Sequence, residues 1–185
     1  MPWPPKNWAN EFMKKSILVI GVAGSGKSSV SKKLNDLGYK AYDIEEIDGL
    51  FKTINKNTGE VYEDFENNDL EKVKNMDWKC DLKKLQEIIE NETSDIAFYC
   101  GTASNWEDLI ALFDKIILFK VNPEVIERRL TTRSVKDFGG TKEVRDWALE
   151  WKGWLEEEIE KKGVIIVDAN DNPEKVAKEI IKSVV

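Results

Sequence analysis

Histidine is absent from this chain of 185 residues, and only two cysteines occur, Cys80 and Cys100. The lack of histidine excludes histidine-based catalytic triads, histidine-ligated zinc and imidazole general bases. The two cysteines lie far apart and do not have the spacing of a metal site. Because Cys100 ends an apolar run, we expect its thiol to be buried rather than to act as a nucleophile.

Long hydrophobic runs are also missing. No apolar stretch approaches the ~20 residues of a membrane-spanning helix. Residues 1–12 are rich in proline and tryptophan but contain no hydrophobic segment of the kind found in secretory signals. We therefore expect a cytoplasmic protein that does not contact membranes, with residues 1–12 as an N-terminal extension and residues 13–185 as a single domain.

Positively charged side chains are fewer than negatively charged ones. The sequence has 28 lysines and arginines and 35 aspartates and glutamates, which gives a net charge of −7. An acidic surface repels the backbone of nucleic acids, so a nucleic-acid partner is disfavoured. The same charge also serves solubility. Any anionic ligand must be held by a local positive pocket.

Short apolar runs alternate with segments of helical spacing along the chain. The expected strands are residues 16–20, 39–42, 96–100, 115–121 and 164–167. The expected helices are residues 27–37, 81–90, 105–113, 123–133, 142–162 and 173–184, with Asp81 and Asn105 as N-caps of two of them. This alternation predicts an α/β fold, a three-layer sandwich in which a five-stranded parallel sheet is flanked by helices.

Two segments break the alternation. Residues 49–79 are irregular, and the turn signal at Asn55–Gly59 predicts a hairpin between residues 51–54 and 60–62. Residues 134–141 contain Gly139-Gly140 and are expected to form a mobile loop. We interpret both segments as additions to the sheet rather than as parts of it.

A glycine-rich segment follows the first strand and opens the first helix, and it fits the pattern of a phosphate-binding loop. Its glycines permit positive φ, so backbone amides can point at a phosphate, and the helix adds its own free N–H groups. Lys27 would reach the terminal phosphates, and the Ser28 hydroxyl is a suitable ligand for Mg²⁺. The expected nucleotide-binding residues are Gly21, Ala23, Gly24, Ser25, Gly26, Lys27, Ser28 and Ser29, with ATP and Mg²⁺ as the ligands.

We do not expect a GTPase, because the sequence lacks the Asn-Lys-x-Asp motif with which GTPases recognise guanine. From Ser16 to Val185 the layout resembles that of P-loop small-molecule and nucleoside-monophosphate kinases, the shikimate kinase-like and adenylate kinase-like proteins. The resemblance implies a kinase-type P-loop fold. Residues 49–79 would then form an acceptor-side insertion, and residues 134–141 a lid.

An acidic segment after the second strand carries part of this resemblance. Asp43-Ile44-Glu45 resembles the Asp-x-Asp of shikimate kinase-like enzymes, which implies that Asp43 binds the metal together with Ser28 and that the second carboxylate faces the acceptor. Glu45 departs from that pattern, so Asp48 or Glu46 is an alternative acceptor contact.

Further along the chain, Arg129 and Arg133 resemble the arginine pair that leads into the lid of adenylate kinase-like folds. The resemblance implies that Arg129 packs on adenine and that Arg133 contacts phosphates. It also places Asn170 in the adenine-side loop and Gly101 near the acceptor. Lys27, Asp43 and Arg133 are thus the expected catalytic residues.

The function we expect is ATP-dependent phosphotransfer to a small acceptor, either a nucleoside monophosphate or a hydroxylated metabolite. The absence of arginine from residues 49–79 weakens the first option. An ATP-binding regulatory module or an NTPase is the alternative, because the third strand ends in Tyr99-Cys100-Gly101 without an aspartate. Trp147, Trp151 and Trp154 are either packing residues, in a core or a dimer surface, or an aromatic wall of the site. A monomer and a homodimer are both compatible with the sequence.

Overall fold

The computed structural model describes residues 14–185, so the predicted N-terminal extension, residues 1–12, lies outside it. The elements in chain order are β1 (Lys15–Ile20), α1 (Lys27–Asp36), β2 (Lys40–Asp43), the 3-10 helix η1 (Ile44–Glu46), β3 (Phe51–Asn55), α2 (Leu70–Lys74), β4 (Met76–Cys80), α3 (Leu82–Asn91), β5 (Ile96–Cys100), α4 (Trp106–Ile110), β6 (Lys115–Lys120), α5 (Pro123–Thr131), α6 (Lys142–Glu160), β7 (Ile165–Asp168) and α7 (Pro173–Val184).

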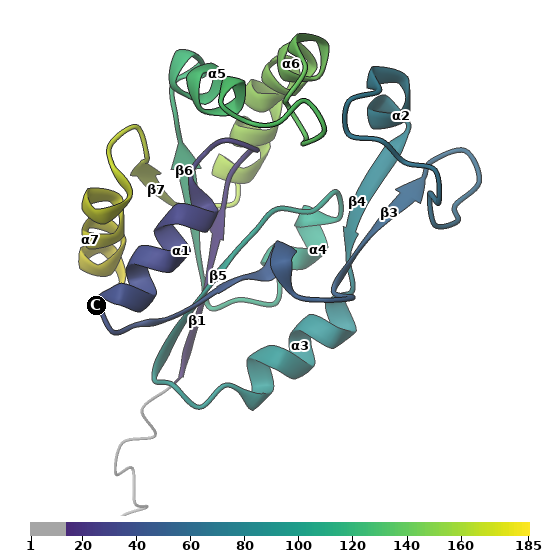
Figure 1. Ribbon diagram of the computed structural model, residues 1–185. Helices are drawn as coiled ribbons and strands as arrows, with labels where there is room; N and C mark the ends of the chain where they lie inside the picture. The colour runs from purple at the N-terminus through teal and green to yellow at the C-terminus, as the bar shows by residue number, and fades with distance from the viewer. Residues whose placement is uncertain (1–13) are drawn as a thin grey trace, which may run out of the picture.

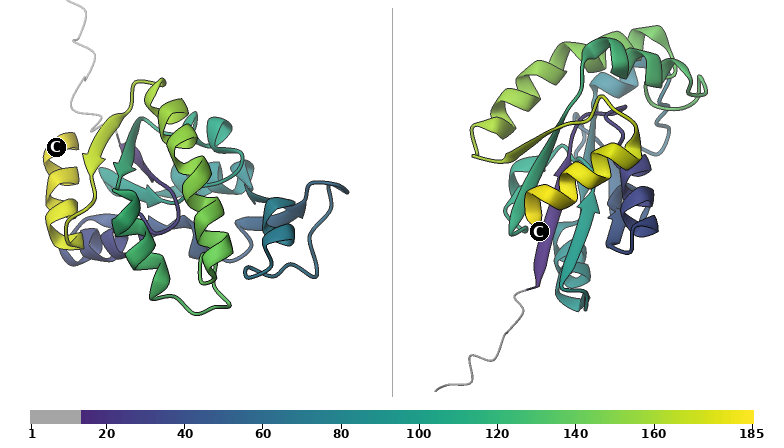
Figure 2. Two further views of the ribbon diagram at one scale, coloured as in Figure 1. Left: turned by 90° about the horizontal axis from the view of Figure 1, so that it is seen from above. Right: turned by 90° about the vertical axis from the view of Figure 1, so that its left-hand side faces the viewer.

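The main sheet has five strands in the order β2-β5-β1-β6-β7, and every neighbouring pair is parallel. Residues 17–20 of β1 are fully buried at its centre. Figures 1 and 2 show α1 and α7 side by side on one face of the sheet, with α4 and α6 on the other. The predicted parallel sheet flanked by helices is confirmed.

The register brings the ends of three strands to one edge of the sheet. Cys100, the last residue of β5, lies between Val19 of β1 and Asp43 of β2. The glycine-rich loop after β1 and the acidic η1 after β2 therefore begin next to each other. In open parallel sheets ligands bind at this carboxyl edge.

The predicted hairpin forms next to its turn, where Ile54 and Val61 make an antiparallel bridge. The Asn55 amide donates to the Glu60 carbonyl and the Tyr62 amide donates to the Thr53 carbonyl, both at 2.9 Å. The longer ladder of β3 is with β4, an antiparallel pairing that the sequence did not predict and that places Thr53 opposite Trp78. The turn itself is present, since the Gly59 amide donates to the Asn55 carbonyl at 2.8 Å. Residues 60–69 are mostly acidic or amide side chains, whereas β4 supplies an aromatic ring that stacks on Phe51 at 5.1 Å.

Asn105 occupies the N-cap position of α4 as predicted, but its side chain does not cap the helix. That side chain instead pairs with the backbone of Cys80, accepting from the amide and donating to the carbonyl at 3.0 Å each. The helix ends at Ile110 rather than Phe113. Asp81 does cap α3 as predicted, accepting from the Lys84 amide at 3.0 Å.

The helices of the described chain, residues 14–185, include none with both the length and the apolar character needed to cross a lipid bilayer.

Candidate functional site

The glycine-rich loop has the backbone geometry of a phosphate cradle. Gly24 and Gly26 have φ of 80° and 98°, values that favour glycine. Gly26 also caps α1, so the free amides at the head of that helix face the loop. Lys27 is 9% exposed, and its ammonium donates to the carbonyls of Gly21 and Val22 at 2.8 and 3.2 Å. The buried Lys27 ammonium and the free backbone amides at the start of α1 can together bind an anion such as phosphate.

The side chains around this cradle fit a nucleotide and its metal. The Ser25 hydroxyl is buried without a hydrogen-bond partner among the described residues, and Ser28 is exposed at the start of α1. Asp43 lines the same cavity as Ser28. Residues 14–185 hold no group of three or more metal-binding carboxylate or thiol side chains. A metal at Ser28 and Asp43 would therefore need phosphate and water oxygens, which Mg²⁺ accepts readily.

A single cavity of about 1500 Å³ gathers most of the predicted site residues. The predicted residues that line it are Ala23, Gly24, Ser25, Gly26, Lys27, Ser28, Ser29, Asp43, Glu45, Arg129, Arg133 and Asn170. Gly21, Asp48 and Gly101 do not line it, although Gly21 holds Lys27 through its carbonyl. Trp147, Trp151 and Trp154 also line the cavity, in agreement with the aromatic-wall alternative.

Asp48 and Gly101 support the site from outside. The Asp48 carbonyl accepts from the Lys84 ammonium at 2.7 Å. A Cβ added to Gly101 would lie 2.9 Å from Cδ1 of Ile44, closer still to its Cγ1, and 3.2 Å from Cγ of Glu45. The missing side chain at residue 101 therefore lets η1 pack against the end of β5. Of the three acidic candidates for the acceptor, Glu45 and Glu46 line the cavity and Asp48 does not.

Glu45 is held from three directions. One carboxylate oxygen accepts from the Thr102 amide at 2.9 Å, and the other accepts from the indole N–H of Trp78 at 3.2 Å. The Lys27 ammonium lies 3.9 Å from Oε1. These contacts join the phosphate-binding loop, η1, the β3–β4 hairpin and the β5–α4 turn.

Thr102 is a site residue that sequence reasoning missed. Its hydroxyl donates to the Gly21 carbonyl and accepts from the Gly21 amide at 3.2 Å. The two residues are widely separated in the chain, and no motif joins them. The pairing of β1 with β5 is what brings them together.

Arg129 joins the glycine-rich loop to the loop after β7. Its Nη1 donates to the Gly24 and Ser25 carbonyls at 3.3 and 3.1 Å, and its Nη2 donates to the carbonyls of residues 169–171 at 2.9 to 3.4 Å. Burial, with a smaller contribution from Arg128, lowers the pKa of Arg129. The guanidinium thus links the glycine-rich loop to the loop after β7 at this side of the cavity.

The loop of residues 134–141 is held by two other arginines. Arg133 donates to the Phe138 carbonyl at 3.0 Å, and Arg145 donates to the carbonyls of Gly139 and Gly140 at 3.1 and 2.8 Å. The same segment also packs on α5, because a Cβ at Gly139 would meet Leu130 at 3.1 Å. The predicted lid is therefore anchored at its C-terminal end, near the cavity.

Asn170 and Cys100 have structural partners. The Asn170 side chain accepts from the Asn122 amide and donates to Asp168, both at 2.8 Å, and so connects the ends of β6 and β7. Cys100 is fully buried, and burial, assisted by the charge of Asp43, raises the pKa of its thiol to about 12. The thiol is therefore neutral, in agreement with the expectation that it is not a nucleophile.

Known proteins resemble this chain in sequence and in fold. No family model matches it. The dephospho-CoA kinase of Fusobacterium nucleatum is 33% identical over an alignment of 120 residues, which covers 57% of this chain and 60% of that enzyme. The matched segment thus spans less than two thirds of the relative.

Solved structures extend the likeness to nearly the whole chain. A Thermus thermophilus protein aligns with a TM-score of 0.56 at 18% identity, covering 92% of this chain and 98% of its own. The shikimate kinase from Acinetobacter baumannii, solved in complex with shikimate, aligns with a TM-score of 0.54 at 17% identity and covers 93% of each chain. The five parallel strands, the flanking helices and the glycine-rich loop thus form the fold that this chain shares with the solved shikimate kinase.

Proposed function

We propose that this chain transfers the γ-phosphoryl group of ATP to a small acceptor. The observation that carries the proposal is the distance of 3.9 Å between the Lys27 ammonium and a Glu45 carboxylate oxygen in one cavity. A phosphate-binding lysine then stands beside a carboxylate able to orient an attacking hydroxyl. That pairing suits phosphoryl transfer, which depends on positioning and charge neutralisation.

Each residue has a role in this proposal. Lys27 and the loop amides would hold the terminal phosphates and offset charge that develops during transfer. Ser28 and Asp43 would hold Mg²⁺, which neutralises phosphate charge when bound. Glu45 would orient the acceptor hydroxyl and take its proton, and Arg133 would contact phosphates from the lid. Water is excluded when residues 134–141 cover the site.

The size of the cavity supports two substrates. Sites for a single small molecule have volumes of roughly 300–1000 Å³, and this cavity measures about 1500 Å³. The Fusobacterium enzyme is named for dephospho-CoA and the Acinetobacter structure holds shikimate, so each of these similar proteins is associated with a small organic compound. We propose the same general arrangement here, with residues 49–79 on the acceptor side of one catalytic domain and no nucleic-acid substrate.

The test is ADP formation in the presence of nucleoside monophosphates and hydroxylated metabolites, run beside calorimetry with ATP and Mg²⁺. Lys27→Ala is expected to lower turnover by a factor of about 100–1000, the usual cost of losing one group that stabilises the transition state. Lys32→Ala is the matched control, because Lys32 is an exposed lysine on the same helix. Full turnover in Lys27→Ala, or ATP binding without stimulation by any acceptor, would contradict the proposal.

A further inference from the structure

The cavity has two halves of opposite charge. We call the acceptor half the lining residues that come from η1, the β3–β4 hairpin and the turn between β5 and α4. The sequence contains four arginines, all within residues 128–145. Those residues belong to α5, the lid and the start of α6, so none lies in the acceptor half. Arg129, Arg133 and Arg145 are moreover bound to backbone carbonyls.

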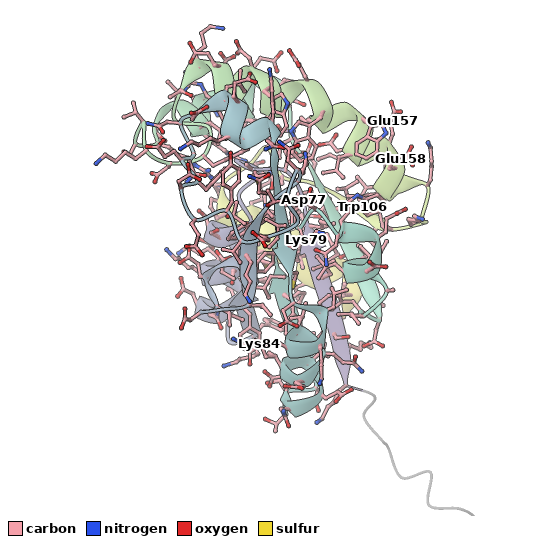
Figure 3. The ribbon with its side chains drawn as sticks, turned by 90° about the vertical axis from the view of Figure 1, so that its right-hand side faces the viewer. Asp77, Lys79, Lys84, Trp106, Glu157 and Glu158 are labelled. Atoms are coloured by element: carbon pink, nitrogen blue, oxygen red, sulfur yellow. The ribbon has the colours of Figure 1, made fainter. Side chains whose placement is uncertain are left out.

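The acceptor half is rich in carboxylates. Glu45, Glu46 and Asp77 line it, against Lys56 as the only cation among its described lining residues. Lys56 is directed to the Lys74 carbonyl, to which it donates at 3.0 Å. Lys79 lies 3.9 Å from Asp77, and Figure 3 shows the two on the same strand. A phosphate monoester in this half would meet three like charges, and each like charge nearby disfavours an anion.

The walls of the cavity are aromatic. Every tryptophan in residues 14–185 lines it: Trp78, Trp106, Trp147, Trp151 and Trp154. Trp78 stacks on Phe51 and is thereby fixed in the hairpin. Figure 3 labels Trp106, which is buried and has the Lys162 ammonium 5.9 Å from the centre of its ring. Trp78, Trp147 and Trp151 are half-buried, and Trp154 is 58% exposed. Flat rings that stay partly open to solvent, as these four do, suit a ligand that carries a ring of its own.

We propose that the acceptor is a ring-bearing alcohol without a phosphate group, neutral or cationic. This inference rests on the proposed function. The ring would pack against the indole of Trp78 in the acceptor half, and the hydroxyl would lie between Glu45 and the terminal phosphate. The acceptor oxygen then bonds to the γ-phosphorus, the bond from that phosphorus to the β-phosphate oxygen breaks, ADP leaves, and Glu45 takes the hydroxyl proton.

The test compares matched pairs of acceptors on the full chain with ATP and Mg²⁺. Each pair holds a compound and its phosphate monoester: adenosine, cytidine and thymidine with their 5′-monophosphates, and pyridoxine with pyridoxine 5′-phosphate. We expect the unphosphorylated member of at least one pair to stimulate ADP release at least about tenfold more than its partner, a difference of 1.4 kcal/mol. Stronger stimulation by the phosphate monoesters overturns this inference while it confirms phosphotransfer. Stimulation by neither member, with ATP binding intact, overturns the inference and the proposed function together.

Two variants test the charge and the ring separately. Glu46→Lys replaces an exposed lining carboxylate and is expected to shift the ratio of the two rates toward the monoester at least about fivefold. Glu60→Lys, which makes the same change outside the cavity, should leave the ratio unchanged. Trp78→Leu should raise the KM of the ring acceptor at least about tenfold while the KM of ATP stays constant, since stacking on an aromatic ring contributes roughly 1–3 kcal/mol. An unchanged ratio in Glu46→Lys or an unchanged KM in Trp78→Leu contradicts the proposed recognition.

Discussion

Gly101→Ala should lower the rate of phosphoryl transfer by displacing residues of the acceptor half, and it should leave the affinity for ATP unchanged. The added methyl would meet Ile44, which is fully buried. Overpacking of this kind costs about 1–3 kcal/mol. To relieve it, η1 must move away from β5 and carry Glu45 with it. A misplacement of a reacting group by about 1 Å lowers the rate by up to about 100-fold. We therefore expect a large loss of transfer rate in a protein that remains folded.

The assay pairs urea denaturation with initial rates of ADP formation and with calorimetric titration of ATP. Gly153→Ala is the matched control, because a Cβ at this helical position meets nothing within 4 Å. It should be neutral or stabilising by about 0.5–1 kcal/mol. Stability and rates like those of the unchanged chain in Gly101→Ala would refute the reasoning.

A second variant identifies the atoms that clash. Ile44→Ala removes both the Cγ1 and the Cδ1 and should cost about 2–5 kcal/mol alone. Adding Gly101→Ala to it should cost nothing more, because the new methyl enters the vacated space. The two substitutions are thus expected to couple by about 1–3 kcal/mol, and strict additivity would exclude a direct clash.

The remaining predictions concern the contacts around the site. Arg129→Lys keeps the charge but loses the forked bonds to the two loops, so it should cost about 1.5–3 kcal/mol in urea denaturation and weaken ATP binding by calorimetry. Arg128→Lys, which breaks none of those bonds, should cost less than about 0.5 kcal/mol. Thr102→Val removes the hydroxyl that binds Gly21 and should destabilise by about 1–3 kcal/mol, whereas Thr102→Ser should restore most of the loss. Burial alone would raise the pKa of Glu92, but hydrogen bonds from Tyr42, Ser94 and Thr93 lower it to about 2 from an ordinary 4.5. The stability from Glu92 is therefore present above pH 4.5 and is lost as the pH falls toward 2, so Glu92→Gln should flatten that part of a denaturation profile against pH.

The sheet and the phosphate cradle were predictable because their signals are local. The buried run of β1 is continuous in sequence, and the glycines that follow it specify a backbone conformation that few other residues adopt. The strand register then places Asp43 and Gly101 at the same edge as this loop without any further information.

Pairing across long loops was not predictable. The short pairing of β3 with residues 60–62 follows from the turn between them, but the longer ladder with Met76–Cys80 has no local signal and is accompanied by the stacking of Phe51 on Trp78. The same holds for Asn105, whose side chain fits a helix cap in sequence but finds the Cys80 backbone in the fold. These outcomes depend on residues brought together only by tertiary packing.

The bonds of Arg129 have a consequence for how the protein is made. The guanidinium connects Gly24, near the start of the described chain, with the carbonyls of residues 169–171 close to its end. A domain generally folds as one unit, so its last elements must be present before its contacts are complete. The glycine-rich loop after β1 therefore lacks the bonds of Arg129 to residues 169–171 until β7 and the loop after it have been synthesised. The proposed binding of ATP is therefore expected only after residues 169–171 have joined the fold.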